Sequence, residues 1–310
     1  MKLSVLLADY LPEFGVTIKN EKEFETLGLV GSKTGGSKCT FIDSADFIEN
    51  VPDDVVMVFT KEEYADMLLD EGRGVCITES PRLLFFKLHN AISQESFYAR
   101  ETFETQIGTG CSISELASVA ETNVKIGNNV VIEEFVVIRE NTVIGDNCII
   151  RTGCKLGCPD FEFKREHNTI FGVKHIGGVR IGRNVEVLPN TGINKAIYPW
   201  DDTVVDDYCK IDMLCNISHG AKIGSNTMIV ALSGIGGRTR VGENCWIGYG
   251  CILKNGITVG NNARVNMGSV VSKDVGEGQA VTGNFAIEHK KFIEDLKRRS
   301  KYFEMYRREK

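Results

Sequence analysis

Several residue types that would indicate a known architecture are scarce in this chain of 310 residues. It has 6 Pro and 2 Trp, and its 10 Cys include no C-x-x-C spacing. Its 32 Gly show no G-X-Y period, which excludes collagen. No apolar run is long enough for a membrane span, and Asp9 ends the N-terminal apolar run too early for a secretory signal. A net charge of −6 argues against broad nucleic-acid binding.

What the chain does have is a repeat of six residues. Stepping by six from Ile181 to Val271 meets an aliphatic residue at every position except Pro199, and the same step runs from Ile126 to Leu156. This period fits neither an α-helix nor a lone strand. It is typical of the hexapeptide parallel β-helix, in which three short strands make a coil of about 18 residues with the aliphatic side chains inside. Glycine and asparagine, which often follow the aliphatics, suit the corners.

The two ends of the chain lack this period. Residues 1–97 contain two apolar runs that predict strands, at 55–59 and 74–77, and two segments that predict helices, at 62–69 and 82–92. We therefore predict a mainly β protein with an α/β domain at 1–100, a β-helix of about eight coils at 101–283 and a C-terminal helix at 284–310. Residues 157–175 break the repeat and are expected to leave the prism as a loop, a common place for functional residues.

The C-terminal helix is basic. From residue 286 to the end there are nine Lys or Arg and five Asp or Glu. Two interpretations are open. The helix could cap the end of the prism, which a solenoid needs, or it could bind an acidic partner.

Most of the cysteines follow the repeat. Seven of them lie two residues before a six-step aliphatic, at a position that elsewhere holds Ala, Ser or Thr: Cys111, Cys148, Cys154, Cys209, Cys215, Cys245 and Cys251. A buried free cysteine behaves as a small apolar residue. We therefore expect reduced, structural cysteines and a reducing, cytoplasmic location.

Few residues can carry chemistry, because the chain has only five His. No pair of them has the short spacing of a γ-type carbonic anhydrase zinc site, so we expect no metal. His219 follows the inward-pointing Ile217 near a corner of the prism. A carboxylate beside it would fix its tautomer, and Asp201, one regular coil earlier, and Asp212, one strand earlier, are the candidates. A histidine held in this way can act as a general base.

The stretch from Asp202 to His219 resembles the signature of the UDP-3-O-acylglucosamine N-acyltransferases of lipid A synthesis. The resemblance continues through Ala221–Gly224 and Gly242–Gly248, and it includes the interruption and its exit at His175–Gly182. It is strong from about 125 to 275 and faint before 100. The family implies a left-handed β-helix, homotrimers with sites between neighbouring prisms, and His219 as the base for a sugar amine. It also implies a nucleotide held by the N-terminal domain and a 3-hydroxyacyl thioester on acyl carrier protein.

The resemblance and the repeat together suggest further substrate-binding residues. In the family, N-terminal aromatics stack on the nucleobase, and the matching positions here are Tyr64 and, near Val58, Phe59. The remaining candidates for substrate binding are His175, Asn194, Gly237 and Asn255. Gly237 lies one coil after His219, where its backbone N–H would stabilise an oxyanion.

Three readings of function stay open. The chain departs from the family at Gly220, which replaces an Asn, and at Gly256, which replaces a second His near the thioester. It could therefore be the lipid A enzyme using acyl carrier protein, or an N-acyltransferase for a dTDP-linked amino-deoxy sugar using acyl-CoA. In either case the thioester is a co-substrate, and no bound cofactor is expected. The third reading is a hexapeptide scaffold without activity. A nucleotidyltransferase module is disfavoured, because the first 100 residues lack a phosphate-cradling glycine-rich motif.

Overall fold

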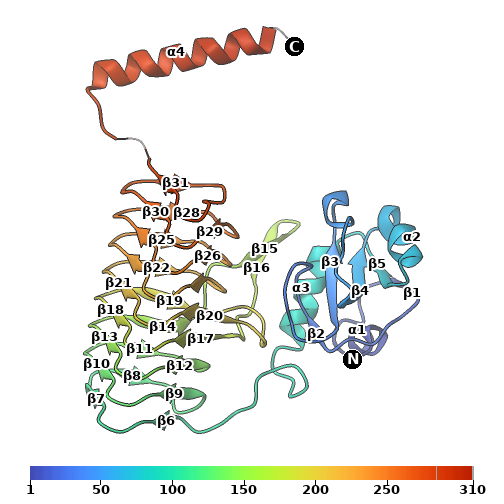
Figure 1. Cartoon of the computed structure of the whole chain (residues 1–310). Helices are drawn as coiled ribbons and strands as arrows, with labels where there is room; N and C mark the ends of the chain where they lie inside the picture. The colour runs from blue at the N-terminus through green and yellow to red at the C-terminus, as the bar shows by residue number, and fades with distance from the viewer. Residues whose placement is uncertain (284, 309–310) are drawn as a thin grey trace.

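In a computed structural model the chain forms a β-helical prism, an α/β domain beside it and a C-terminal helix (Figure 1). The structure describes residues 1–283 and 285–308, with side chains described up to residue 299. The mainly β architecture with stacked parallel coils confirms the fold predicted from the six-residue repeat.

The N-terminal domain is a five-stranded sheet in the order β1-β5-β4-β3-β2. The pairings are parallel except for β1 with β5. Its elements are α1 (Leu3–Tyr10), β1 (Thr17–Lys19), β2 (Thr26–Leu27), β3 (Lys38–Ile42), the short 3-10 helix η1 (Ala45–Phe47), β4 (Val55–Thr60), α2 (Glu62–Asp70), β5 (Gly74–Ile77) and α3 (Pro81–Ala91). The predicted strands and helices correspond to β4, β5, α2 and α3. No element was predicted from the sequence at the position of β3, which contains Phe41.

The prism has three faces, each a parallel sheet with one strand from each coil. The first face contains β6 (Gln106–Ile107), β9 (Val124–Ile126), β12 (Thr142–Ile144), β17 (Gly178–Ile181), β20 (Asp202–Val205), β23 (Lys222–Ile223), β26 (Arg240–Val241) and β29 (Thr258–Val259). The second contains β7 (Ser112–Ile113), β10 (Val131–Ile132), β13 (Ile149–Ile150), β18 (Glu186–Val187), β21 (Lys210–Ile211), β24 (Met228–Ile229), β27 (Trp246–Ile247), β30 (Arg264–Val265) and β32 (Ala280–Val281). The third contains β8 (Ser118–Val119), β11 (Val137–Ile138), β14 (Lys155–Cys158), β19 (Gly192–Asn194), β22 (Asn216–Ile217), β25 (Gly234–Ile235), β28 (Ile252–Leu253) and β31 (Val270–Val271).

The interior of the prism is a single apolar column of the six-step aliphatics and the cysteines. Six of the seven repeat cysteines are buried in it, and Cys111 packs partly buried against its end. All ten cysteines are free thiols. Burial raises the pKa of Cys148 and Cys154 to about 11, so these groups stay protonated and apolar. The predicted packing role of the repeat cysteines is confirmed.

The corners of the prism differ from one another. Between the first and second faces, most coils place an Asn with positive φ, and we call this the asparagine corner: Asn129, Asn147, Asn184, Asn226, Asn244 and Asn262. Asparagine tolerates this left-handed conformation better than other non-glycine residues. Between the second and third faces, the leucine corner carries Leu116, Phe135, Leu214 and Leu232 with exposed side chains.

The third corner, between the third and first faces, holds His219, and we call it the histidine corner. Two excursions leave the prism there. The first, after β14, is a β-hairpin, β15 (Phe163–Glu166) and β16 (Thr169–Gly172), where the sequence predicted an irregular loop. The second, residues 195–201, was not predicted. It lengthens one coil by six residues, so the six-residue period continues in phase after it. Pro199, the one position of this step without an aliphatic residue, lies within it.

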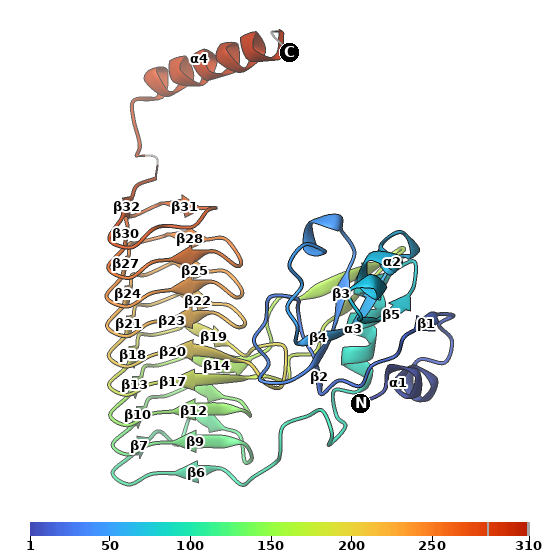
Figure 2. The ribbon, with the colours of Figure 1, turned by 45° about the vertical axis from the view of Figure 1, so that its right-hand side comes forward.

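Both excursions pack against the N-terminal domain (Figure 2). Ile197 and Tyr198 share one apolar core with α1 and α3. The indole N–H of Trp200 donates to the carbonyl of Leu27 at 2.9 Å. His89 on α3 lies 2.8 Å from the carbonyl oxygen of Lys174 through Nε2. Burial lowers the pKa of His89 to about 4, so this imidazole is neutral. The domain is therefore held beside the coil that carries His219.

The C-terminal helix α4 (His289–Arg308) stands off the last coils of the prism (Figure 1). Its described side chains are mostly exposed. The prediction that it caps the open end of the prism is therefore wrong, because the helix does not lie across that end.

Candidate active site

His219 lies just after β22 and is almost fully buried, with 3% of its surface exposed. Its Nδ1 lies 2.8 Å from Oδ2 of Asp160, and its backbone N–H donates to the same oxygen at 2.8 Å. Asp160 is in the excursion that follows β14, 59 residues earlier in the chain. The interruption in the repeat therefore supplies the carboxylate that orients the histidine.

The charge state of Asp160 follows from these contacts. Burial by itself would raise the pKa of its carboxyl group. The hydrogen bonds from the His219 side chain, from the His219 backbone and from the N–H of Phe161 outweigh burial and hold the pKa below its ordinary value. An ionised Asp160 accepts a hydrogen bond from Nδ1–H of His219. The proton then stays on Nδ1, and Nε2 keeps a lone pair. This is the tautomer that a general base requires.

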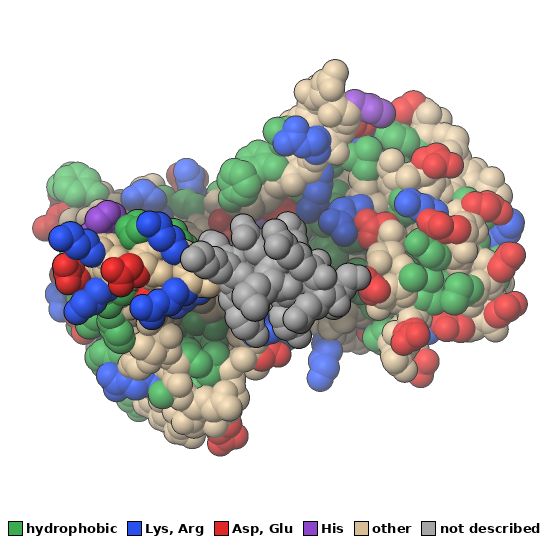
Figure 3. All heavy atoms as spheres, turned by 90° about the horizontal axis from the view of Figure 1, so that it is seen from above, with side chains coloured by type: hydrophobic (Ala, Val, Ile, Leu, Met, Phe, Trp, Pro, Cys, Tyr) green, Lys and Arg blue, Asp and Glu red, His purple; other side chains and the backbone are tan. Residues whose placement is uncertain are grey.

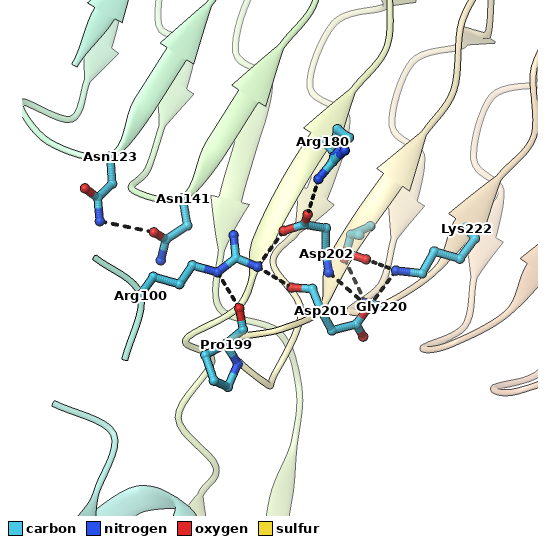
Figure 4. Close-up of polar contacts among 10 residues, drawn as sticks. Arg100, Asn123, Asn141, Arg180, Pro199, Asp201, Asp202, Gly220 and Lys222 are labelled. Atoms are coloured by element: carbon cyan, nitrogen blue, oxygen red, sulfur yellow. Dashed lines mark hydrogen bonds and ion pairs between the residues drawn. The ribbon is translucent and has the colours of Figure 1, made fainter. Parts of the chain in front are cut away.

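Neither carboxylate that the sequence suggested for this role contacts His219. Asp201 pairs with Lys222 at 2.6 Å (Figure 4), and Asp212 accepts the backbone N–H groups of Met213 and Ala231 at a turn. The prediction for Asp201 assumed a coil of 18 residues. The coil before His219 is longer, with its hydrogen-bonded positions 24 residues apart, so Asp201 lies elsewhere on this corner.

Asp201 belongs to a network that fixes the start of β20 (Figure 4). Arg100, in the segment leading into the prism, donates to the carbonyl of Pro199 at 2.6 Å and to Oδ1 of Asp202 at 2.7 Å. Arg180 reaches the other oxygen of Asp202 at 3.2 Å. These contacts anchor the second excursion, so we assign Asp201 and Asp202 a structural role.

The surroundings of His219 Nε2 are crowded. This nitrogen is buried and has no hydrogen-bond partner among the described residues. Oε2 of Glu162 lies 3.4 Å from it. A Cβ added to Gly237 would lie 2.5 Å from it, so only glycine fits beside the ring. The ring of His175 packs edge-on against that of His219, with their centroids 5.6 Å apart.

The structure brings His175 and Gly237 to His219 but gives them different roles from those expected. Burial, and then the neighbouring His219, lower the pKa of His175 to about 4, so it is a neutral packing partner. The N–H of Gly237 already donates to Oδ1 of Asn255 at 3.1 Å, so it is not a free oxyanion donor. Asn194 bonds to Asn216 on the third face and has no contact with His219 among the described residues.

A cavity of about 800 Å³ adjoins this site, between the N-terminal domain and the prism. On the prism side it is lined by Gly220, next to His219, and by Glu162. On the domain side it is lined by aromatic rings of β3, η1 and α3. The aromatic residues around the cavity are Phe41, Phe47, Phe86 and Trp200.

The two aromatics proposed from the sequence do not line this cavity. Phe59 is fully buried in the domain core and packs on Phe85. Tyr64 on α2 packs against a separate apolar cluster of the domain. Phe47, by contrast, is 52% exposed. The sequence offered one signal for the cavity aromatics. Phe41 and Phe47 lie in a segment of the N-terminal domain for which no helix or strand was predicted.

The cavity is also rich in basic side chains: Lys33, Arg82, Lys164, Lys222, Arg238 and Arg240. Three of them are paired with carboxylates, Arg82 with Asp43, Lys164 with Glu162 and Lys222 with Asp201. Viewed from the α4 end, Lys and Arg gather between the two lobes, and Asp and Glu line the outer side of the N-terminal domain (Figure 3). Such a cavity suits an anionic ligand.

Among the described residues, no group of three or more His, Cys, Asp or Glu could hold a metal ion. Within the same residues, no helix is long and apolar enough to cross a membrane.

Sequence comparisons place the repeats in a known group. The family described as bacterial transferase hexapeptide (six repeats) matches residues 123–158, and the hexapeptide repeat of succinyl-transferase matches residues 238–273. Both segments lie in the prism. These two segments thus match hexapeptide repeats, as the six-residue period predicted.

Curated relatives are similar over part of the chain. The chain is 31% identical over 137 residues to the UDP-3-O-acylglucosamine N-acyltransferase of Delftia acidovorans, covering 44% of this chain and 40% of the relative. It is 42% identical over 91 residues to that of Rickettsia prowazekii, covering 29% and 26%. The resemblance noted in the sequence is confirmed, although the chain spans well under half the length of these relatives.

Among solved structures, the UDP-N-acetylglucosamine acyltransferase of Arabidopsis is similar, with a TM-score of 0.46 and 25% identity over 58% of this chain and 68% of that one.

Proposed function

We propose that this chain is an N-acyltransferase that moves an acyl group, of the 3-hydroxyacyl type, from a thioester to the amino group of a nucleotide-linked amino sugar. One observation carries the proposal. A buried histidine, oriented by Asp160 and with no hydrogen-bond partner for Nε2 among the described residues, lies beside a cavity lined by aromatic and basic side chains. The similarity of part of the chain to N-acyltransferases supports it.

The chemistry needs no covalent enzyme intermediate. The sugar amine, in its uncharged form, attacks the thioester carbonyl carbon, and His219 Nε2 takes a proton from the nitrogen as the C–N bond forms. When the C–S bond breaks, the imidazolium returns that proton to the leaving thiolate. Asp160 stabilises the imidazolium in between. General base catalysis of this kind is typically worth about 10²–10⁴-fold.

The cavity suits a nucleotide diphosphate as the handle of the acceptor. Phe47 and Trp200 offer apolar ring surface for a base, and Trp200 is itself held by stacking on Tyr198. Lys33, Arg238 and Arg240, which form no ion pair among the described residues, offer charge for two phosphates. Arg238 has positive φ, at 58°, and its N–H donates to the carbonyl of His219, so its backbone is held next to the base.

The acyl donor is proposed to be CoA- or carrier-protein-linked. A basic helix that stands away from the body is accessible to an acidic carrier protein. We keep acyl-CoA with a dTDP-linked acceptor as the second candidate, because Gly220 and Gly256 both lie at the cavity edge where the family carries larger side chains.

We also propose a homotrimer. At the leucine corner, Phe135, Leu214 and Leu232 are about half exposed or more and have φ near +60°, a conformation that costs energy for a large side chain. Leu232 and Leu214 lie on adjacent coils. Exposed apolar residues in a strained backbone are typical of an interface. Association of three copies would cover this corner.

The test is an assay of thiol release with a panel of acceptors and donors. The acceptors are UDP- and dTDP-linked amino sugars, and the donors are 3-hydroxyacyl-CoA and 3-hydroxyacyl carrier protein. We expect turnover with one pairing, an amide product by mass spectrometry and a loss of about 10²–10⁴-fold in His219→Ala. Absence of turnover with every pairing, or full activity in His219→Ala, would contradict the proposal.

A further inference from the structure

Glu162 lies beside the imidazole of His219. Its Oε2 is 3.4 Å from Nε2 of His219, and both side chains are nearly buried, at 12% and 4% exposed. Its other oxygen, Oε1, pairs with Lys164, whose ammonium group lies over the ring of Phe86. Lys164 therefore holds the carboxylate in place, with Oε2 turned toward the imidazole.

Two acceptors thus face one another across a short gap. With Nδ1–H donated to Asp160, Nε2 presents a lone pair, and Oε2 of a carboxylate presents another. A group that carries two or more N–H bonds can satisfy both acceptors at once. A hydroxyl group has a single hydrogen and satisfies only one of them, which leaves the other buried and unpaired.

We infer that Glu162 is a specificity-determining residue that selects an amine over a hydroxyl as the acceptor. The inference rests on the proposed function and assigns the chemical class of the nucleophile to one side chain. The sugar amine, in its uncharged form, donates one N–H to Glu162 Oε2 and the other to His219 Nε2, and its lone pair is left to attack the thioester carbonyl carbon. Glu162 binds and positions the nitrogen, whereas His219 takes its proton.

A site built to pair with a polar group discriminates strongly against an analogue that leaves its partners unpaired. Glu162 lies on the excursion after β14 and not on a strand of the prism, so the residue that selects the amine can change while the prism strands stay the same. The same prism without a carboxylate at this position would retain the base and lose the preference for an amine.

The experiment compares Glu162→Gln with wild type for matched acceptor pairs that differ in one group. UDP-glucosamine is compared with UDP-glucose, and a dTDP-linked 4-amino sugar with its 4-hydroxy counterpart. Glu166→Gln removes a carboxylate from the same hairpin, one that pairs instead with Lys87, and is the control. We expect Glu162→Gln to lower kcat/KM for the amine by about 10- to 100-fold, mainly through KM, because a charge-assisted hydrogen bond is lost. Activity with the hydroxyl analogue should stay the same or rise.

Binding separates this inference from the proposed function. Isothermal titration calorimetry of the same acceptor pairs with the wild-type protein, in the absence of an acyl donor, needs no turnover. Tighter binding of UDP-glucosamine or of the dTDP-linked amino sugar than of its hydroxyl analogue, abolished in Glu162→Gln, supports the inference even if the acyl donor is wrong. Equal losses for amine and hydroxyl in Glu162→Gln, with a shifted acid limb of the pH profile, would show that Glu162 only stabilises the protonated imidazole and would overturn the inference.

Discussion

The asparagine corner and the histidine corner both recur along the prism, but they differ in regularity. The asparagine corner carries the same residue type in most coils, whereas the histidine corner is interrupted by the two excursions. At the asparagine corner most coils place an Asn near φ +57°, and the side chain of Asn129 bonds to that of Asn147 in the next coil at 3.3 Å. At the histidine corner a similar ladder joins Asn123 to Asn141 at 3.2 Å (Figure 4), but it stops where the excursions begin. Gly220, Arg238 and Gly256 then take its place.

The difference teaches which residues build the fold and which carry the proposed chemistry. At the asparagine corner the same residue type takes up the same left-handed backbone conformation in most coils, so these residues indicate the fold. At the histidine corner the two excursions interrupt the repeat. They bring Asp160 to the imidazole of His219, and they pack against the N-terminal domain, which lines the adjoining cavity. The predictions below change one corner and use another as the control.

The largest expected effect is on turnover in His219→Ala. We expect a loss of about 10²–10⁴-fold in kcat with little change in melting temperature, because the base is removed and the aliphatic column is untouched. The measurement is the steady-state rate of thiol release beside a thermal melt. A collapse of stability that accounts for the lost rate would contradict the assignment.

Gly237→Ala is expected to give the next largest loss. Its Cβ would lie 2.5 Å from His219 Nε2, so the ring must shift from the position that the proton transfer needs. We expect kcat to fall by about 10²-fold, as for an ångström-scale misplacement. Gly250→Ala at the leucine corner is the matched control, because its Cβ meets open space and only its positive φ is strained. Similar losses of activity in both variants would show that the imidazole is not crowded as described.

Acid should loosen the histidine corner before the rest of the prism. The pKa of His175 in the folded chain is lowered to about 4 from 6.5. Between pH 6.5 and 4, His175 is therefore protonated in the unfolded chain and neutral in the folded chain. The neutral form therefore stabilises the fold above pH 6.5, and this contribution, up to about 3 kcal/mol, is lost as the pH falls toward 4. Urea unfolding at several pH values should show a shallower pH dependence in His175→Gln than in wild type. An unchanged slope would contradict this account.

Asn244→Ala at the asparagine corner should give the smallest effect. Its φ of 56° is costly for alanine, so we expect a loss of about 1–2 kcal/mol in the free energy of unfolding and unchanged kcat. Denaturant unfolding and the thiol-release assay check both parts. A fall in kcat comparable to that of Gly237→Ala would remove the distinction between the corners.

The sequence predicted what repeats and missed what does not. The period gave the prism, its inward aliphatics and the packing of the cysteines, because each coil restates the same constraint. The excursion at residues 195–201 stayed hidden because it adds six residues and keeps the phase, and Asp201 was misplaced for that reason. Asp160 and Glu162 could be expected only as members of an interruption, since no spacing relates them to His219. The cavity aromatics depend on how the N-terminal domain docks, which no local pattern encodes.

The central claim is that Asp160 and His219 act as one unit at the histidine corner. A double-mutant cycle of Asp160→Asn and His219→Ala, read out as kcat/KM, tests it most directly. We predict that each single change lowers kcat/KM by at least about 10²-fold and that the double variant is no worse than His219→Ala, because Asp160 acts only through the imidazole. Losses that multiply in the double variant would show that Asp160 and His219 act independently, which would contradict the account.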